Sequence, residues 1–261
     1  MPVMQRIEIN GVKLEVEQVG AAPDQRGLAP LVVLHEGLGS VAMWRDWPQR
    51  ICHATGRCGW VYSRRGYGQS DPVPDVRRTG RLQPDYLHEQ AWSVLPALLQ
   101  ALDIERPVLV GHSDGASIAL LYASRYPVAA CVAIAPHVMV EDLSVKAIAQ
   151  ARVSFETGDL RKRLARHHAN VDCAFWQWND IWLDPAFRAF DIRADCTRIS
   201  APVLALQGLE DPYGTLQQIE QICLPDDQIT RLTLAQCGHS PHRDQPELTT
   251  HAITHFLAKV A

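Results

Sequence analysis

A serine stands between two glycines where the local pattern of the chain changes abruptly. The residues VLV at 108–110 are apolar and suit a buried strand, whereas residues 116–123 carry apolar side chains at helical spacing. Only the five residues GHSDG at 111–115 join the two, so the turn from strand to helix must be tight. This G-x-S-x-G pattern is typical of a strained turn that exposes a nucleophilic serine hydroxyl. We therefore predict that Ser113 is a catalytic nucleophile.

A serine hydroxyl needs a base to take its proton, and that base needs a carboxylate to orient it. In one chain order of such triads the serine comes first, then the carboxylate, then the histidine. Asp211 follows the apolar run PVLALQG at 202–208, and His239 lies in the loop QCGHSPHRDQPE before the last helical stretch. We predict that Asp211 orients His239 and that His239 is the base.

Each of these two assignments has an alternative within the sequence. His242 lies three residues beyond His239 and is a second candidate for the base. Glu141 or Asp142, which follow the preceding predicted strand, are alternative orienting acids. The order and position of Asp211 and His239 after predicted strands favour them.

The elements that must position these residues alternate along the chain. Residues 5–20 alternate apolar and polar side chains around Asn10-Gly11, which predicts a hairpin. Helical patterns such as that at 85–104 separate most of the later apolar runs, which predicts a mostly parallel sheet covered by helices on both faces. The apolar runs are 31–35, 59–63, 108–111, 128–135, 202–208 and 229–235.

One interval is too long for a simple connection between strands. About sixty residues, 140–200, separate the fifth of these runs from the sixth, and structureless loops of that length are uncommon. We predict a small helical cap at 140–200, inserted late in the sheet, and a core domain formed by 1–139 and 201–261. A basic run within the cap is expected to be a solvated helix face; it comprises Arg161, Lys162, Arg163 and Arg166.

Composition limits the class of protein and its partners. The chain has 261 residues, 47% of them hydrophobic and 21% charged, as in an ordinary globular protein. A net charge of −4 gives no excess of basic residues for nucleic acid, and no apolar run reaches the roughly 18 residues of a membrane span. The start MPVMQRIEIN lacks the apolar region of a signal peptide, and seven scattered cysteines suit a reducing compartment. We expect a cytoplasmic protein with no nucleic-acid or membrane partner; its oligomeric state is open, a homodimer included.

Two further segments carry a family resemblance. SRRGYGQSDP at 63–72 looks like a Gly-rich turn after an early strand, and CGHSPHRDQPE at 237–247 looks like a histidine loop. With GHSDG, these segments make the chain similar to the α/β-hydrolase family over nearly its whole length. The resemblance implies a triad of Ser113, His239 and Asp211, an acyl-serine intermediate, and no metal or organic cofactor. Ser63 departs from the aspartate that is common at its position.

The resemblance also implies an oxyanion hole. The family often has His-Gly before the donating residue, whereas this chain reads LHEGLGS at 34–40. By spacing we expect the Leu38 N–H as one donor, with Gly37 as the alternative, and the Asp114 N–H as the second. The Asp114 carboxylate then lies near a developing negative charge. We expect it either to cap the first turn of the helix or to meet a cationic group of the substrate.

The remaining candidates concern the substrate pocket. Phe175, Trp178 and Trp182 fall on one helical stripe of the expected cap, so Trp178 and Trp182 are candidate substrate-binding residues. Glu36 and His137 are further candidates. No motif in the cap identifies a substrate.

We therefore predict a serine hydrolase that cleaves small-molecule carboxylic esters. A thioesterase, a C–C hydrolase of β-dicarbonyl compounds and a cofactor-free perhydrolase are mechanistic alternatives on the same fold. A ligand receptor that uses the same pocket without turnover is the non-enzyme alternative.

Overall fold

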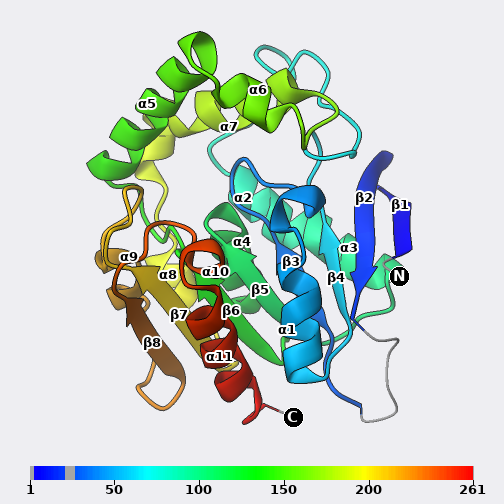
Figure 1. Ribbon diagram of the computed structural model, residues 1–261, viewed down its shortest axis with the longest axis vertical. Coiled ribbons are helices and arrows are strands. Elements are labelled where there is room, and N and C mark those ends of the chain that lie inside the picture. Colours follow the sequence, from blue (N-terminus) through cyan, green and yellow to red (C-terminus); the bar gives the residue numbers. More distant parts are fainter. Residues whose placement is uncertain (1–2, 21–26, 261) are drawn as a thin grey trace.

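A computed structural model describes residues 3–20 and 27–260 (Figure 1). Over these residues eight strands form one sheet in the order β1-β2-β4-β3-β5-β6-β7-β8. The strands are β1 (Val3–Ile9), β2 (Val12–Val19), β3 (Leu31–Leu34), β4 (Gly59–Tyr62), β5 (Val108–His112), β6 (Ala130–Ile134), β7 (Val203–Gly208) and β8 (Ile229–Leu234). β1 and β2 are antiparallel to their neighbours, and all pairs from β4 to β8 are parallel. The predicted mostly parallel sheet is confirmed.

The hairpin between β1 and β2 turns where the sequence indicated. Ile9 pairs with Val12, and the two residues between them have positive φ, 51° at Asn10 and 76° at Gly11. Two consecutive positive φ values suit a two-residue hairpin whose twist matches that of the strands. This hairpin extends the sheet beyond β4 on its antiparallel side.

Helices cover both faces of the sheet, as predicted. On one face α1 (Trp47–Thr55) packs against α11 (Pro246–Leu257), in front of the sheet in Figure 1. The opposite face carries α2 (Tyr86–Glu89), the π-helical η2 (Gln90–Val94), α3 (Leu95–Ala101), α4 (Asp114–Ala123) and α8 (Arg193–Cys196). Short elements in the connections are η1 (Val41–Trp44), η3 (Pro185–Ala189), α9 (Gln217–Glu220) and α10 (Pro241–Asp244).

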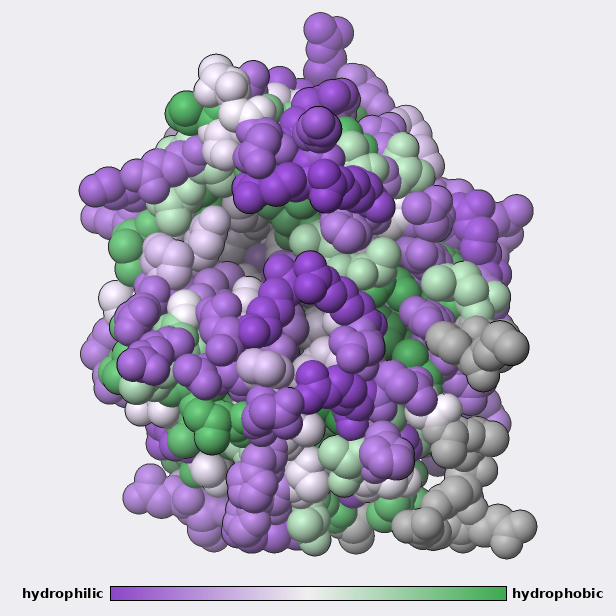
Figure 2. Space-filling model, in the orientation of Figure 1, coloured by the Kyte–Doolittle hydropathy of each residue, from purple (hydrophilic) through white to green (hydrophobic). Residues whose placement is uncertain are grey.

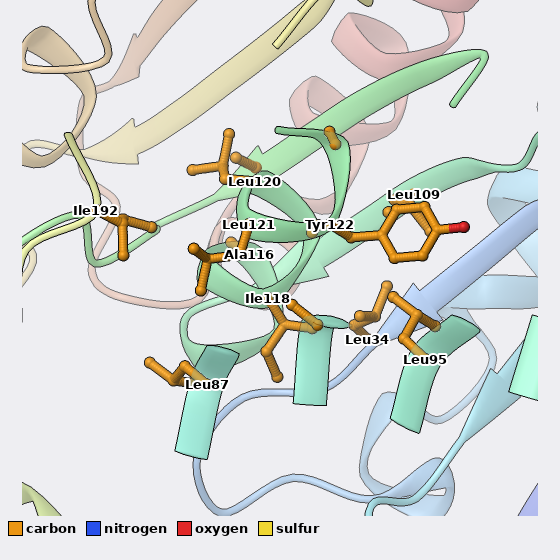
Figure 3. Close-up of a cluster of buried hydrophobic side chains, with 14 of the residues drawn as sticks. Leu34, Leu87, Leu95, Leu109, Ala116, Ile118, Leu120, Leu121, Tyr122 and Ile192 are labelled. Atoms are coloured by element: carbon orange, nitrogen blue, oxygen red, sulfur yellow. The ribbon is translucent and has the colours of Figure 1, made fainter. Parts of the chain in front are cut away.

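Helix α4, which follows Ser113, is the most enclosed of these helices. All ten of its residues are buried. Figure 3 shows apolar side chains from the sheet and from neighbouring segments around it, among them Leu34, Leu87, Leu95, Leu109 and Ile192. Burial on all sides explains why the helix is apolar around its whole circumference rather than along one stripe. The residue at its N-terminus is therefore held by the core of the protein.

Residues 140–200 are mostly helical. Helices α5 (Asp142–Thr157), α6 (Leu160–Leu164) and α7 (Val171–Trp182) lie together above one end of the sheet (Figure 1). The segment then returns to the core, because the Ile192 N–H donates to the Val138 carbonyl (2.8 Å) and α8 packs against α4. The division into a core domain and a cap at 140–200 stays a prediction.

The surface of the predicted cap carries the basic run. All four of its residues are exposed. Arg161 bonds to Asp172 through two nitrogens, and Arg163 lies 3.6 Å from Asp159.

The space-filling view is mainly hydrophilic on this face and is hollowed below the region of helices α5, α6 and α7 (Figure 2). None of the helices in 3–20 and 27–260 has the length and apolar character to cross a membrane.

Candidate active site

The turn that carries Ser113 is strained, and its two glycines are required by close packing. Ser113 has φ 54° and ψ −120°, a backbone conformation that non-glycine residues rarely adopt. A Cβ on Gly111 would overlap the carbonyl oxygen of Gly115, and a Cβ on Gly115 would overlap that of Leu34. The Ser113 N–H donates to the Ile134 carbonyl (2.9 Å), which ties the turn to β6. This geometry places the serine at the end of β5, directly before α4.

The structure brings Ser113, His239 and Asp211 together from three separate loops. His239 Nε2 lies 2.9 Å from Ser113 Oγ, and His239 Nδ1 lies 2.7 Å from Asp211 Oδ2. An ionised carboxylate only accepts hydrogen bonds, so Nδ1 carries the proton and Nε2 accepts from the serine hydroxyl. This tautomer is the one that a general base for Ser113 requires.

Asp211 is held as an oriented anion by two residues that sequence reasoning missed. Gln207 Nε2 donates to Asp211 Oδ2 (2.7 Å), and the Tyr213 N–H donates to Oδ1 (2.7 Å). Burial alone would raise the pKa of Asp211, but its hydrogen bonds to His239 and to the Tyr213 N–H lower that pKa below its ordinary value. The Tyr213 ring also packs against His239, with centroids 4.8 Å apart. Asp211 therefore stays ionised when it orients His239.

The alternative base and acids lie elsewhere. Both ring nitrogens of His242 are buried without a hydrogen-bond partner, and its ring packs against Trp44, 4.6 Å away. Glu141 accepts from the Thr215 N–H (2.9 Å) and from Gln218 Nε2 (2.6 Å). Asp142 is exposed and pairs with Arg188. The structure places none of the three in contact with the Ser113–His239 pair.

The turn at residues 36–39 offers donors for an oxyanion. The Gly39 N–H donates to the Glu36 carbonyl (3.1 Å), which closes a β-turn with Gly37 and Leu38 at its centre. Both central residues line the cavity that contains Ser113. Within the described residues the N–H groups of Gly37, Leu38 and Asp114 have no hydrogen-bond acceptor. Leu38 and the alternative, Gly37, thus both remain candidate donors beside Asp114.

Arg64 and His35, which are both buried, fix the orientation of the peptide groups at the start of this turn. Arg64 Nη1 donates to the His35 carbonyl (2.6 Å) and Nη2 to the Glu36 carbonyl (3.0 Å). The Arg64 N–H donates to His35 Nε2 (3.0 Å), so the proton is on Nδ1, which donates to the Glu36 carbonyl (2.6 Å). Because N–H and C=O point in opposite directions across a trans peptide, fixing the Glu36 carbonyl also fixes the direction of the Gly37 N–H.

His168 links the same turn to the segment after α6. The Gly68 N–H donates to His168 Nδ1 (3.0 Å), so Nε2 carries the proton and donates to the Leu38 carbonyl (3.0 Å). Burial lowers the pKa of His168 to about 4, so the ring is neutral near pH 7. No signal in the sequence distinguishes His168 from a surface histidine.

The Asp114 carboxylate is buried within a network that the sequence did not predict. It accepts from Tyr86 Oη (2.8 Å) and Trp182 Nε1 (3.3 Å) and lies 3.8 Å from Arg64 Nη2. Burial raises the pKa of Asp114, and Arg64, Tyr86 and Trp182 offset part of that rise. The carboxylate thus bonds to α2 and α7 instead of capping the first turn of α4. A contact between Asp114 and a cationic group of the substrate stays a prediction.

Glu36 lies at the cavity but is also paired within the protein. Its carboxylate lies 3.5 Å from His112 Nδ1 and 3.2 Å from Arg243 Nη2. Burial would raise the pKa of Glu36, but His112 and Arg243 hold it well below its usual range. In the part of the chain that the structure describes, no group of three or more His, Cys, Asp or Glu side chains is arranged to hold a metal ion.

The cavity over Ser113 has a volume of about 140 Å³. A cavity of about 150 Å³ accommodates a benzene molecule, so this one suits a group of similar size. Its lining includes the four predicted pocket residues, Glu36, His137, Trp178 and Trp182, together with Ile148 of α5 and Tyr213. Phe175 differs: it stacks on Phe155 of α5 at 3.7 Å.

Trp178 closes tightly on the candidate oxyanion turn. A Cβ on Gly37 would overlap the indole nitrogen of Trp178, so only glycine fits at this point. Helix α7 therefore contacts the turn directly and forms one wall of the cavity.

Ser63, which stands where an aspartate was expected, bonds to a carboxylate from another strand. Ser63 Oγ donates to Glu15 Oε2 (2.6 Å), and the Gln69 N–H donates to the same oxygen (2.9 Å). Glu15, on β2, therefore supplies an acceptor for the Gly-rich turn at the position where the family resemblance led us to expect an aspartate.

Comparison with known proteins agrees with this fold. The family model described as alpha/beta hydrolase fold matches residues 29–189, and the chain belongs to that family. Its general class is therefore that of the hydrolases built on this fold. No curated protein sequence matches the chain.

Solved structures resemble the chain over almost its whole length at low identity. An enol-lactonase from Burkholderia xenovorans is 18% identical with a TM-score of 0.72, over 98% of this chain and 100% of that one. A thermophilic esterase from Thermogutta terrifontis is 19% identical with a TM-score of 0.73, over 98% of each chain. A proline iminopeptidase from Mycobacterium smegmatis is 17% identical with a TM-score of 0.68, over 98% of each chain. At these identities the likeness concerns the fold.

The buried pair of Arg64 and Asp114 gives a prediction about stability. Arg64→Met should lower the free energy of unfolding by about 3–5 kcal/mol, because it leaves the Asp114 carboxylate buried without its cationic neighbour. Urea unfolding measures this change. The control is Arg65→Met, since Arg65 is adjacent and exposed; it should change the free energy by no more than about 0.5 kcal/mol. The double variant Arg64→Met/Asp114→Asn should lose less free energy of unfolding than Arg64→Met alone, because it also removes the buried carboxylate. An equal loss in the two variants would contradict this explanation.

Proposed function

We propose that this protein is a serine hydrolase that cleaves small carboxylic esters through an acyl-serine intermediate. The observation that carries the proposal is the chain of hydrogen bonds from Ser113 Oγ through His239 to Asp211, at a strained turn that faces a cavity. Membership of the alpha/beta hydrolase fold family supports it. The esterase and lactonase activities in the names of two structural neighbours are consistent with it.

In the first half of the proposed reaction, Ser113 Oγ attacks the ester carbonyl carbon while His239 Nε2 takes the hydroxyl proton. The carbonyl oxygen becomes an oxyanion, which the Asp114 N–H and the Leu38 or Gly37 N–H stabilise; each such donor contributes about 3–4 kcal/mol to lowering the barrier. The Asp211 carboxylate stabilises the imidazolium that forms. When the oxyanion collapses, the C–O bond to the alcohol breaks, and His239 returns its proton to the departing alkoxide oxygen.

In the second half, water replaces the alcohol. His239 takes a proton from the water as its oxygen attacks the acyl carbon, and the same N–H donors stabilise the second oxyanion. Collapse breaks the bond to Ser113 Oγ, which regains its proton from His239. The products are a carboxylic acid and an alcohol, and no cofactor is needed for the balance.

The same residues would serve related reactions. A thioesterase, a hydrolase of C–C bonds in β-dicarbonyl compounds and a perhydrolase share this nucleophile and base, and a receptor would use the cavity without turnover. A panel of p-nitrophenyl esters of increasing chain length, with thioesters and β-diketones alongside, separates esterase, thioesterase and C–C hydrolase by which bond is cleaved, and a receptor would cleave none. Formation of peracid from the same esters in hydrogen peroxide would identify a perhydrolase.

We also propose a cytoplasmic location. Six of the seven cysteines are buried, and no disulfide joins any two of them in the described chain. This arrangement is consistent with a compartment that keeps thiols reduced.

The nucleophile can be tested directly. A fluorophosphonate probe should label the wild-type protein once, at Ser113, because His239 activates that hydroxyl and the cavity admits a small electrophile. Ser113→Ala should abolish labelling, as measured by intact-protein mass spectrometry. Ser93→Ala, at an exposed serine of η2 that does not line the cavity, is the control and should still be labelled. Continued labelling of Ser113→Ala would contradict the assignment.

The orienting acid is tested by substitutions that keep its size. Asp211→Asn should reduce kcat for a p-nitrophenyl ester by about 10⁴-fold, because an amide no longer fixes the His239 tautomer or stabilises its charged form. Glu141→Gln is the matched control and should retain near-normal kcat. The reverse result, a small loss at 211 and a large loss at 141, would show that Glu141 is the acid.

The wall formed by Trp178 should determine acyl length. Trp178→Ala should raise kcat/KM for octanoate relative to butanoate esters by about tenfold or more, because each extra methylene group gains apolar contact in the enlarged cavity. Trp176→Ala is the control, since the Trp176 ring faces Arg77 (3.8 Å) and does not line the cavity. If both variants shift the ratio equally, the cavity wall does not control selectivity.

A further inference from the structure

His137 is a buried polar side chain at the cavity whose ring has no hydrogen-bond partner among the described residues. Only 2% of its surface is exposed, and it lines the cavity with Ser113. Its Nδ1 is fully buried without a hydrogen bond, and neither ring nitrogen bonds to any residue in 3–20 or 27–260. Buried polar groups in native proteins are almost always hydrogen-bonded, so an imidazole in this state needs a partner from outside the chain.

The position of His137 is fixed by its backbone. Ser117 Oγ donates to the His137 carbonyl (2.6 Å) and accepts from the His137 N–H (3.1 Å). The next residue, Val138, donates its N–H to Gln218 Oε1 (2.8 Å). Ser117 belongs to α4, the helix that begins directly after Ser113. The imidazole is therefore held in a constant relation to the nucleophile.

The ring lies between an aromatic wall and the proposed base. Its centroid is 4.8 Å from the Trp182 ring and 5.6 Å from the His239 ring. Burial, together with the nearby His239, lowers the pKa of His137 to about 3, so the ring is neutral near pH 7. A neutral imidazole has one nitrogen that donates and one that accepts, so it can bind either a carbonyl or a hydroxyl group.

The two carboxylates at the cavity are already engaged by other side chains. The Asp114 carboxylate bonds to Tyr86 and Trp182, and the Glu36 carboxylate lies against His112 and Arg243. Much of the remaining wall is apolar, formed by Leu38, Ile148, Trp178 and Trp182. Against such a wall, the His137 imidazole is a polar group that selects molecules presenting a matching polar atom.

We propose that His137 binds a second oxygen of the substrate, in a hydroxyl or carbonyl group whose oxygen is three or four bonds from the ester carbonyl carbon. The substrates are then small esters that carry this extra oxygen on either the acyl or the alcohol part. The proposal rests on the proposed function, because it assumes that Ser113 attacks an ester in this cavity. The ring contact between His137 and His239 is what places the extra oxygen close to the reacting carbon.

The test uses matched esters and three variants. The esters are ethyl butanoate, ethyl 3-hydroxybutanoate, ethyl 3-oxobutanoate and 2-hydroxyethyl butanoate, assayed by pH-stat. His137→Phe keeps a ring but removes both nitrogens, and His137→Gln restores a donor and an acceptor. The control is His251→Phe, since His251 is exposed on α11, away from the cavity.

Wild type should prefer at least one oxygenated ester over ethyl butanoate, and the preferred one identifies the part of the substrate that His137 contacts. His137→Phe should reduce that kcat/KM ratio about tenfold, the size expected for one buried hydrogen bond. His137→Gln should recover part of the ratio, and His251→Phe should leave it unchanged. An equal loss on all four esters, or an unchanged ratio, would overturn the proposal and leave His137 as a packing residue or the ligand of an ordered water.

A binding measurement separates this proposal from the proposed function. Calorimetry on Ser113→Ala compares the affinity for the preferred oxygenated ester with that for ethyl butanoate, without turnover. The preference should survive in Ser113→Ala and disappear in Ser113→Ala/His137→Phe. If wild type cleaves none of the esters, the hydrolase assignment fails, and the calorimetric preference alone decides whether His137 binds the oxygen. Equal affinities in both variants would overturn the proposal.

Discussion

The close approach of β3, β5 and α4 around Ser113 is the constraint on which the candidate site depends. Glycines at 111 and 115 allow backbone atoms to touch where any side chain would overlap a carbonyl oxygen. Ser113 can keep its positive φ only because the buried helix that follows leaves it no alternative. The strain is local, whereas the packing that sustains it extends through the core (Figure 3).

A second constraint is the burial of charge beside the nucleophile. Arg64 donates to the carbonyls of His35 and Glu36 and lies near the Asp114 carboxylate. The same guanidinium therefore neutralises a charge at the start of α4 and fixes the turn that faces it. The two sides of the candidate oxyanion hole are joined through one buried group, which keeps their N–H donors in a constant relation.

The helices above the sheet complete the cavity instead of only covering it. Trp178 packs on Gly37, and Trp182 donates to Asp114, so α7 contacts both the turn and the residue after the nucleophile. The small volume and aromatic walls of the cavity follow from these contacts. The size of the cavity and the packing of the turn at 36–39 thus both depend on one helix.

The sequence by itself determined the sheet, the hairpin at Asn10-Gly11 and the positions of Ser113, Asp211 and His239 after predicted strands, because each has a local pattern: alternation, apolar runs, glycine spacing. It could not reveal Tyr86, Arg64 or His168, since their partners lie 28, 29 and 130 residues away and no short-range pattern marks such contacts. Only the tertiary structure decided that Asp114 bonds to Tyr86 and Trp182, that Phe175 stacks on Phe155 and does not line the cavity, and that the His137 ring has no hydrogen-bond partner among the described residues. Local patterns specify backbone conformation, whereas the environment of a side chain depends on segments that only folding brings together.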